Sequence, residues 1–444
     1  MTTPTTRPSG RAGRHILYVA WGFPPHRGPG TYRPLAAVNA LAAKGRRVTV
    51  LTTDLDTFDL VVGGDDALLA TVDERVRVVR VPTANGARDP VINRWPEARV
   101  ANATLWRGRS LGVETSLFPE PIYGSWLPRV VSAARRIHQD DPVDLVVATG
   151  NPYVDFAAAL ALSNDAGIPF VLDDRDAWAL DVYTGEPSPD AARILAWLDC
   201  ALDSASQAWF VNPPLADWHR TRFPRHAHKI RVVENGWDPA FLDPAEVTDV
   251  RPADRPPVLT YVGTINPTLP LKLLAEGWHE ARRRSPLLRA GEFRMVGQFG
   301  HAGTVTRQQE RIAAHYRKDA FRFLGRRPKS ELRAVYDETD VLVFAKEGGG
   351  YVTSGKVYEY VATGLPIVSV LEPGHDARRV LGGYPRWFDA ATWHPRALAE
   401  QMIAAVEDSA QPDRRSVAAG YGRHFRRDTL LTAALADVER ELGW

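Results

Sequence analysis

The chain has 444 residues, which is too long for one ordinary hydrophobic core, so two domains of roughly 200 residues each are expected. Its formal net charge of +2 gives no reason to expect nucleic acid or an acidic membrane as the main partner. A single cysteine, Cys200, excludes a disulfide framework and a cysteine metal site. Residues 1–14 lack an apolar core and should form a disordered tail, and no apolar run is long enough to span a membrane, so a soluble cytoplasmic protein is expected.

Short apolar runs alternate with helical patterns twice along the chain, which is typical of parallel sheets with crossover helices. The first series predicts strands at His15–Ala20, Val48–Thr52, Val76–Val81, Leu145–Ala148, Phe170–Leu172, Ala208–Val211 and Ile230–Val233. The second predicts strands at Val258–Gly263, Phe293–Val296, Phe321–Leu324, Val341–Phe344, Ile367–Leu371 and Trp387–Phe388. The sequence therefore predicts an α/β fold of two doubly wound domains, 15–240 and 258–422, joined by a linker at 241–257. Functional loops should follow the carboxyl ends of the strands.

The loop after the first predicted strand contains Gly28 and Gly30, directly before a helical pattern that begins at Tyr32. Glycines at a helix start let the backbone come close to a ligand. Arg33 stands where the dinucleotide fingerprint needs its third glycine, and the chain has no Gly-Lys-Ser/Thr loop, so a nicotinamide enzyme and a P-loop ATPase are disfavoured. A tight turn without a ligand remains the alternative.

The segment 84–123 is long and irregular and carries several aromatic residues, among them Trp95 and Trp106. A loop of this length in a compact domain either binds something or is partly disordered. No helix is predicted in it.

Three carboxylates stand within four residues after the strand at Phe170–Leu172, in the run Asp173-Asp174-Arg175-Asp176. Asp174 and Asp176 could chelate a divalent ion together with a nucleotide diphosphate. We prefer the interpretation that one of these carboxylates faces the ligand cleft and orients a hydroxyl group of a substrate, either a sugar or a molecule that accepts one. The alternative is a strand end stabilised by an ion pair with Arg175.

The most informative stretch is 353–367, where a helix is predicted to begin near Ser354 and to end at Gly364. Lys356 lies in its first turn, where a cation opposes the helix dipole unless an anion binds there too. Glu359 lies on the same helix face, one turn deeper. A phosphate at the helix start and a diol beside the carboxylate would together describe a nucleotide sugar. The alternative is a surface ion pair between Lys356 and Glu359.

Two further loops of the second half could contribute to a nucleotide site. Gly263 and Thr264 end a predicted strand and could offer donors to a diphosphate, with Lys272 following the same loop. Arg326 follows another predicted strand and a glycine, where backbone groups could contact the edge of a nucleotide base.

Taken in order, these segments resemble glycosyltransferase family 4 from about His15 to the C-terminus. The matching segments are Phe23–Gly30, Val233–Asp238, Tyr261–Thr264 and Ser354–Pro366, and the run Asp174–Trp178 is similar to a branch that carries Arg-Asp-x-Trp. The resemblance implies the GT-B fold, in which two Rossmann-like domains face a central cleft. It also implies retaining, usually metal-independent transfer, with nucleotide held by the C-terminal domain and acceptor by the N-terminal one. The C-terminal segment 423–444 is then expected to return to the N-terminal domain.

Three positions depart from the family pattern. Glu359 matches the second glutamate of a paired motif, whose implied role is to bind the ribose diol, but Tyr351 stands where the first belongs. The sugar contact then falls to Glu347, the amides of residues 348–350 or Tyr351. Thr264 replaces the usual arginine, so Lys272 or Lys356 must supply positive charge. The loop 148–153 lacks the frequent histidine.

These observations predict a retaining, metal-independent transferase that moves a sugar from a uridine or guanosine diphosphate sugar to a small cytoplasmic acceptor, in natural-product or glycan biosynthesis. No cofactor, nucleic acid or membrane partner is expected. The predicted catalytic residues are Lys356, Glu347, Asp174 and Asp176. Donor binding is assigned to Gly28, Gly30, Gly263, Thr264, Lys272, Arg326, Gly355, Lys356 and Glu359, and acceptor binding to Asn151, Tyr153, Arg175 and Trp178.

Three rival functions remain open. The chain could act on lipid-linked sugars, with Val130–His138 touching a membrane. It could be a sugar-nucleotide epimerase of the same fold, or a relative that binds nucleotide without turnover. The sequence does not set the sugar, the base, the accepting atom or the oligomeric state.

Overall fold

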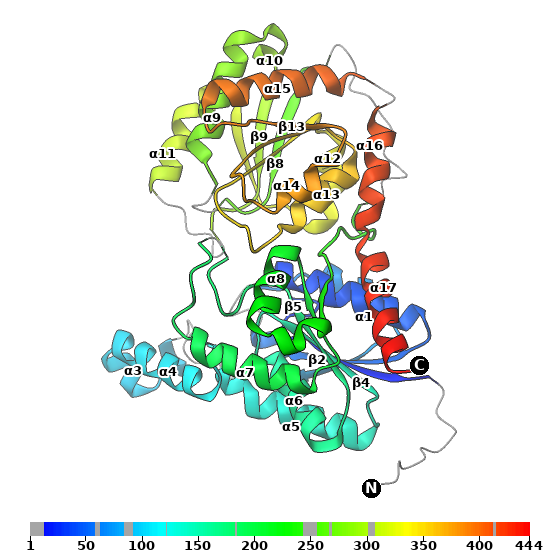
Figure 1. Ribbon diagram of the computed structural model, residues 1–444. Coiled ribbons are helices and arrows are strands. Elements are labelled where there is room, and N and C mark those ends of the chain that lie inside the picture. Colours follow the sequence, from blue (N-terminus) through cyan, green and yellow to red (C-terminus); the bar gives the residue numbers. More distant parts are fainter. Residues whose placement is uncertain are drawn as a thin grey trace. The chain divides into compact units, whose positions relative to one another are not determined.

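The computed structural model describes residues 13–57, 63–83, 92–120, 122–182, 184–242, 255–265, 269–300, 307–411 and 414–444. Most of the predicted tail and of the predicted linker therefore lies outside the described residues. The chain divides into two compact units (Figure 1). Unit 1 comprises the described residues of 1–180, 187–233 and 431–444, and unit 2 those of 181–186 and 234–430.

Unit 1 is built on a seven-stranded parallel sheet of order β3-β2-β1-β4-β5-β6-β7. Its strands are β1 His15–Val19, β2 Arg47–Thr53, β3 Arg77–Val81, β4 Leu145–Gly150, β5 Phe170–Asp174, β6 Gln207–Phe210 and β7 Ile230–Val232. All seven predicted strands of the first series are confirmed. The strand order reverses between β1 and β4, so the loops after these two strands flank the topological switch point, where such sheets bind ligands.

Seven helices within the described part of unit 1 accompany this sheet. They are α1 Tyr32–Ala43, α3 Glu97–Ala101, α4 Ala103–Leu117, α5 Leu127–Asp140, α6 Asp155–Ala166, α7 Ala191–Ser204 and α8 Pro213–Arg222. One face of the sheet forms a core with Leu35, Val38 and Leu41 of α1. The helices α3 and α4 occupy much of the segment predicted to be an irregular loop, so that prediction is wrong for the described residues 92–117.

The helix α5 packs its apolar side against the fold. Val130 and Ala134 are fully buried, and Ile137 is 3% exposed. Arg135 forms an ion pair with Asp165, with 2.6 Å between Nε and Oδ2. Most apolar residues of Val130–His138 are therefore buried within unit 1, which argues against the predicted membrane face on this helix. None of the helices in the described part of the chain is long and apolar enough to span a bilayer.

Unit 2 contains a six-stranded parallel sheet of order β10-β9-β8-β11-β12-β13. Its strands are β8 Val258–Val262, β9 Glu292–Val296, β10 Phe321–Gly325, β11 Val341–Lys346, β12 Ile367–Leu371 and β13 Trp387–Asp389. All six predicted strands of the second series are confirmed. The order reverses between β8 and β11, which places the second switch point at the loops that begin at Gly263 and Glu347.

The helices of unit 2 cover both faces of this sheet. They are α9 Leu271–Arg284, α10 Pro286–Ala290, α11 Arg307–Tyr316, α12 Leu332–Asp337, α13 Gly355–Thr363, α14 Ala377–Leu381, α15 Pro395–Ser409 and α16 Arg414–Gly422. Side chains of β11 alternate between two cores, because Val341 and Val343 pack with α9 and α15 while Leu342 and Phe344 pack with α13. Both faces of the sheet are therefore buried, as parallel sheets require.

The last helix, α17 Arg427–Glu441, begins in unit 2, and its residues from Leu431 onward belong to unit 1. Its start is held by the segment 234–238, where the indole of Trp237 donates to the carbonyl oxygen of Gly422 at 2.6 Å and Arg427 donates to that of Gly236 at 3.0 Å. Gly236 has φ +60°, and a Cβ there would lie 2.5 Å from the carbonyl oxygen of Phe425. This motif thus fixes the path of the C-terminal segment within unit 2.

Candidate functional site

The carboxyl end of β8 meets the start of α13 at the switch point of unit 2. Gly263 follows β8 with φ +140°, and a Cβ on it would lie 1.9 Å from Nζ of Lys356. Only a glycine leaves room for the lysine at this strand end. Gly355, the first residue of α13, has open space where its Cβ would be. The structure thus brings together Gly263, Lys356 and the free amides of a helix start.

The ammonium of Lys356 lies in a poorly solvated position. It donates to the hydroxyl oxygen of Tyr261 at 3.1 Å and stands 4.8 Å from the centre of that ring. Burial lowers the pKa of Lys356 to about 8, although the negative charge of Glu359 acts in the opposite direction. Within the described residues Lys356 has no ion pair closer than 4 Å, so a bound anion would favour its charged form.

Glu359 is paired, but with a different lysine from the one expected. Its Oε1 contacts Nζ of Lys329, and its Oε2 accepts a hydrogen bond from the hydroxyl of Tyr336 at 3.1 Å. Burial alone would raise the pKa of Glu359, yet the charge and hydrogen bond of Lys329 hold it below its ordinary value. The predicted alternative, an ion pair between Lys356 and Glu359, is therefore wrong. Glu359 stays an anion at neutral pH.

The remaining predicted donor residues of unit 2 lie on neighbouring loops. Thr264 follows Gly263, and Glu347 is exposed in the loop after β11. Lys272, in the first turn of α9, has a side chain that is 71% exposed and lies 3.7 Å from Glu276. Arg326 is exposed just after β10. Lys272 is thus already beside a carboxylate, which leaves Lys356 as the stronger candidate for diphosphate contact.

In unit 1, Arg175 connects the loops at the switch point instead of pairing with its neighbouring carboxylates. Its guanidinium donates to the hydroxyl of Thr149 at 2.8 Å and to the carbonyl oxygens of Gly30 at 3.1 Å and Asn151 at 2.8 Å. A Cβ on Gly30 would lie 2.8 Å from Nη1 of Arg175. The predicted ion pair of Arg175 with an adjacent aspartate is therefore wrong.

The ion pair of this strand end joins Asp173 to Arg33. Both side chains are buried, and the guanidinium makes hydrogen bonds of 2.8–3.0 Å to the carboxylate. Arg33 is the residue that breaks the dinucleotide fingerprint, and its structural partner explains its presence in α1. Gly28, in the same loop, is close to His26, because a Cβ there would lie 2.3 Å from the imidazole.

Asp174 and Asp176 differ in environment. The carboxyl of Asp174 is buried and makes no hydrogen bond of ordinary geometry within the described residues, and burial together with the charge of Asp176 raises its pKa well above the ordinary value. Asp176 is partly exposed. No cluster of three or more His, Cys, Asp or Glu side chains in the described ranges is arranged to hold a metal ion.

Two of the predicted acceptor residues form a buried aromatic stack. The rings of Tyr153 and Trp178 are 4.6 Å apart and nearly parallel, and the two residues are only 4% and 6% exposed. The indole of Trp178 donates to the carbonyl oxygen of Pro119 at 3.1 Å. These two predicted acceptor residues are therefore buried in the support of the loop, whereas the predicted acceptor residue Asn151 is exposed.

Glu120 is a residue of this site that sequence reasoning missed. Its Oε2 accepts hydrogen bonds from the backbone amides of Tyr153 and Val154 at 2.8 and 2.9 Å, directly before α6. Burial raises the pKa of Glu120 to about 8, although both hydrogen bonds oppose this change. Nothing in the local sequence marks this contact, because Glu120 is 33 residues from its partner.

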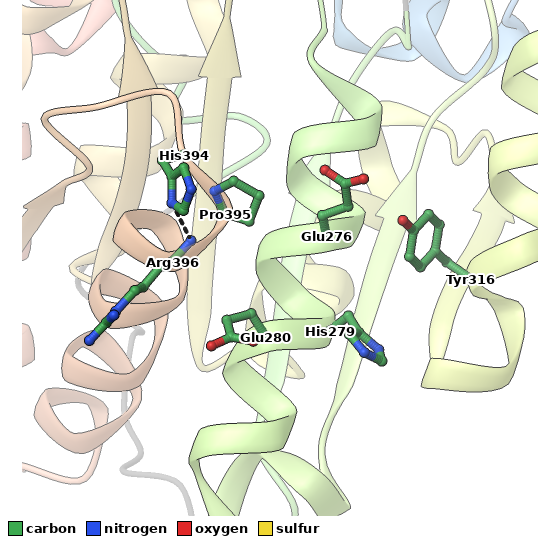
Figure 2. A pocket seen from close by; sticks show the side chains of 7 residues that line it. All are labelled: Glu276, His279, Glu280, Tyr316, His394, Pro395 and Arg396. Carbon is green, nitrogen blue, oxygen red and sulfur yellow. Dashed lines mark hydrogen bonds between the residues drawn. The ribbon is translucent and has the colours of Figure 1, made fainter.

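A cavity of about 320 Å³ lies elsewhere on unit 2 (Figure 2). Its lining residues come from α9, the end of α11 and the start of α15, and they are Glu276, His279, Glu280, Tyr316, His394, Pro395 and Arg396. None of them is a predicted site residue. The imidazole of His394 accepts a hydrogen bond from the amide of Arg396 at 3.2 Å, so it caps the start of α15.

Comparison with known proteins gives a family match for part of the chain. Residues 256–408, which lie in unit 2, match the family described as glycosyl transferases group 1. No curated protein matches the chain in sequence.

Several solved structures share the fold over nearly the whole chain. A glycosyltransferase from Rickettsia africae has a TM-score of 0.63 at 14% identity, with 97% of this chain and 99% of that one covered. Sucrose-phosphate synthase from Thermosynechococcus elongatus has a TM-score of 0.63 at 16% identity, with the same coverage. HepE from Anabaena, solved with UDP and glucose, has a TM-score of 0.59 at 14% identity, with 96% and 100% covered. The two parallel sheets of this chain thus have the GT-B fold.

Proposed function

We propose that the chain is a retaining glycosyltransferase of family 4, which transfers a hexose or a modified sugar from a UDP- or GDP-sugar to a small cytoplasmic acceptor without a metal ion. The family match in unit 2 and the GT-B fold support transferase chemistry. The complex of HepE with UDP and glucose supports a nucleotide-sugar donor. The ordered motifs from Phe23 to Pro366 support the assignment to family 4.

The observation that carries this proposal is the position of Lys356 against Gly263. When the sugar leaves, negative charge grows on the diphosphate, and a cation at that point lowers the barrier. Lys356 has a pKa of about 8 in the free protein because its ammonium is poorly solvated. A diphosphate over Gly263 would raise the pKa of Lys356 again and hold the ammonium in its charged form, so the lysine interacts more strongly as the leaving group gains charge.

Glu359 is suited to the ribose diol, because a carboxylate accepts two hydroxyl hydrogen bonds. Lys329 keeps the carboxylate of Glu359 ionised, so Lys329 would act indirectly, by supporting the residue that binds the ribose. In the transfer step the bond between the anomeric carbon and the phosphate oxygen breaks while the accepting atom of the acceptor bonds to that carbon. The proton of the acceptor passes to the departing phosphate, so no protein base is needed.

On the acceptor side, Asn151 and Asp176 are the exposed or partly exposed groups around Arg175. Arg175 orders their loop by its bonds to Gly30 and Asn151. We assign acceptor contact to Asn151 and Asp176. The buried residues Asp174, Tyr153 and Trp178 would support the loops that carry them.

The test is a thermal-shift panel of UDP- and GDP-sugars, followed by turnover measurements with exhaustively chelated protein. A ligand that binds only the folded state raises its stability by mass action. The cognate donor should raise the melting temperature of wild type, and Lys356→Met should remove this rise while Lys272→Met keeps it. Retention is read from the anomeric proton coupling constant of the product. A requirement for magnesium or manganese would refute metal independence, and turnover without any acceptor would favour an epimerase.

A further inference from the structure

Two loops pack against each other at the carboxyl edge of the sheet of unit 2. The first, residues 347–350, follows β11, consists of Glu347 and three glycines, and is named here the glycine loop. The second, residues 372–376, follows the neighbouring strand β12 and leads into α14. A Cβ on Gly350 would lie only 3.3 Å from the carbonyl oxygen of Gly374, so the two backbones are close together.

The imidazole of His375, in the second loop, fills the space beside Gly349. His375 is 3% exposed, and its Nε2 would lie 3.1 Å from a Cβ placed on Gly349. Its Nδ1 accepts a hydrogen bond from the amide of Ala377 at 3.0 Å, so the neutral ring carries its proton on Nε2. Burial lowers the pKa of His375 to about 4, and the charge of Lys346 acts in the same direction, so the ring is neutral at pH 7.

The N–H group at Nε2 of His375 is a buried donor. It makes no hydrogen bond within the described residues, and such a group in a folded protein calls for an explanation. The carbonyl oxygen of Gly349 points toward the same loop, because it accepts a hydrogen bond from the amide of Asp376 at 3.5 Å. That bond is long, and a carbonyl oxygen has two lone pairs, so the Gly349 carbonyl can also accept from Nε2 after a small shift.

The peptide group between Gly349 and Gly350 links the inner and outer sides of the glycine loop. In a trans peptide the C=O and the N–H point in opposite directions, so the amide of Gly350 is directed away from His375. This amide makes no backbone hydrogen bond within the described residues. Gly348 and Gly349 have φ values of +65° and +106°, which favour glycine, and glycine peptides reorient at little cost. A side chain that binds the carbonyl therefore decides where the amide points.

We propose that His375 is a positioning residue for the donor sugar. In the donor complex, Nε2 donates to the carbonyl oxygen of Gly349 and so directs the amide of Gly350 at an oxygen atom of the sugar. This inference rests on the proposed function, because it places the sugar of a nucleotide sugar over the glycine loop. His375 acts through the loop, since its ring lies on the side of Gly349 where a Cβ would stand. Its role is therefore separate from diphosphate contact by Lys356.

The test compares the affinity for a nucleotide sugar with that for the nucleoside diphosphate it contains. Calorimetry with UDP-glucose, UDP-N-acetylglucosamine and GDP-mannose, and with UDP and GDP, gives this ratio for each variant. His375→Phe keeps an aromatic ring but removes the donor, whereas His375→Gln offers a side-chain N–H in its place. A neutral hydrogen bond changes an equilibrium constant by about 2- to 12-fold. His375→Phe should weaken nucleotide-sugar binding by about this factor and leave nucleoside diphosphate binding unchanged, and His375→Gln should restore it.

The matched control is His219→Phe in α8 of unit 1. His219 is 1% exposed, and its Nε2 also makes no hydrogen bond within the described residues. This control measures what the loss of a buried imidazole does to the melting temperature, and it should leave both affinities unchanged. A measurement on wild type needs no variant, because a nucleotide sugar, but not its nucleoside diphosphate, should slow hydrogen exchange in the glycine loop.

The outcomes separate this inference from the proposed function. An unchanged affinity ratio in His375→Phe, a His375→Gln variant no better than His375→Phe, or equal exchange in the glycine loop with both ligands would overturn the role of His375 alone. Wild type that binds neither the nucleoside diphosphates nor their sugars would refute the proposed function and this inference with it.

Discussion

Replacing Lys356 with methionine is expected to stabilise unit 2 at pH 7 and to slow sugar transfer strongly. The fold lowers the pKa of this lysine from 10.5 to about 8. One pKa unit corresponds to about 1.4 kcal/mol, so the charged lysine costs the folded state about 3 kcal/mol. Methionine keeps the apolar contact with Tyr261 but loses the hydrogen bond and the cation–π contact, worth about 1 kcal/mol. The net expected gain is roughly 2 kcal/mol.

The same pKa sets how the stability of the wild-type protein depends on pH. Unfolded Lys356 keeps its proton up to about pH 10.5, while the folded protein releases it near pH 8. The unfolded state therefore binds more protons between these values, and the free energy of unfolding should rise as the pH rises from about 8 to about 10.5. Lys356→Met should show a smaller rise, to which Lys229, whose pKa burial also lowers, still contributes. Lys272→Met, which replaces a 71% exposed lysine, should retain it.

Urea unfolding followed by tryptophan fluorescence at pH 7 and at pH 9.5 measures both effects, and a transfer assay measures turnover. Loss of a group that stabilises developing charge typically lowers turnover by roughly 100-fold to 1,000-fold. The reasoning is refuted if Lys356→Met is less stable than wild type at pH 7, or if it transfers sugar at the wild-type rate. Either result would mean that the ammonium is well solvated or that it does not contact the diphosphate.

Three further predictions concern other residues. Glu359→Gln alone should destabilise the fold because it removes the carboxylate charge that the ammonium of Lys329 contacts, whereas the double variant with Lys329→Met should recover stability and still lose roughly 1.5–3 kcal/mol of donor affinity. Recovered affinity in calorimetry would remove Glu359 from the site. The raised pKa of Glu120 means that wild type loses stability as the pH rises from 4.5 to about 8, and Glu120→Gln should lose less stability over this range in denaturant titrations; an equal loss would mean that the Glu120 carboxyl is solvated. Gly236→Ala should lower the free energy of unfolding by about 2 kcal/mol, because its φ is +60° and the Cβ would contact Phe425; an unchanged melting temperature would contradict the tight fit.

Both sheets could be predicted from the sequence because parallel strands are buried on both faces and appear as continuous apolar runs. The helices α3 and α4 could not be predicted in this way, because many of their apolar residues are exposed. Val100 and Val113 face solvent, and Arg99 between Trp95 and Trp106 takes the inner position. A periodicity analysis assumes that apolar residues face the core, so it found no helix in this segment.

The candidate site was predictable where local sequence determines it. The helix start at Lys356, the glycine at Gly263 and the spacing to Glu359 all follow from local patterns. The ion-pair partners do not, because Lys329 is 30 residues from Glu359 and Arg33 is 140 residues from Asp173. Charges that are neighbours in the sequence suggested ion pairs, and the fold instead pairs charges that are far apart in the sequence.

The two switch points differ in electrostatics, and this difference is in line with the proposed placement of the donor on unit 2 and the acceptor on unit 1. At the edge of unit 1, the pKa values of Glu120 and Asp174 are raised, so both acids favour a neutral form and would be further opposed by a nearby diphosphate. The guanidinium of Arg175 is already engaged by three oxygen atoms. At the edge of unit 2, Lys356 is a cation without a close anion among the described residues, beside open helix-start amides. The proposed function would thus place the charged diphosphate at unit 2, where a cation is available, and an uncharged acceptor at unit 1, where added negative charge is disfavoured.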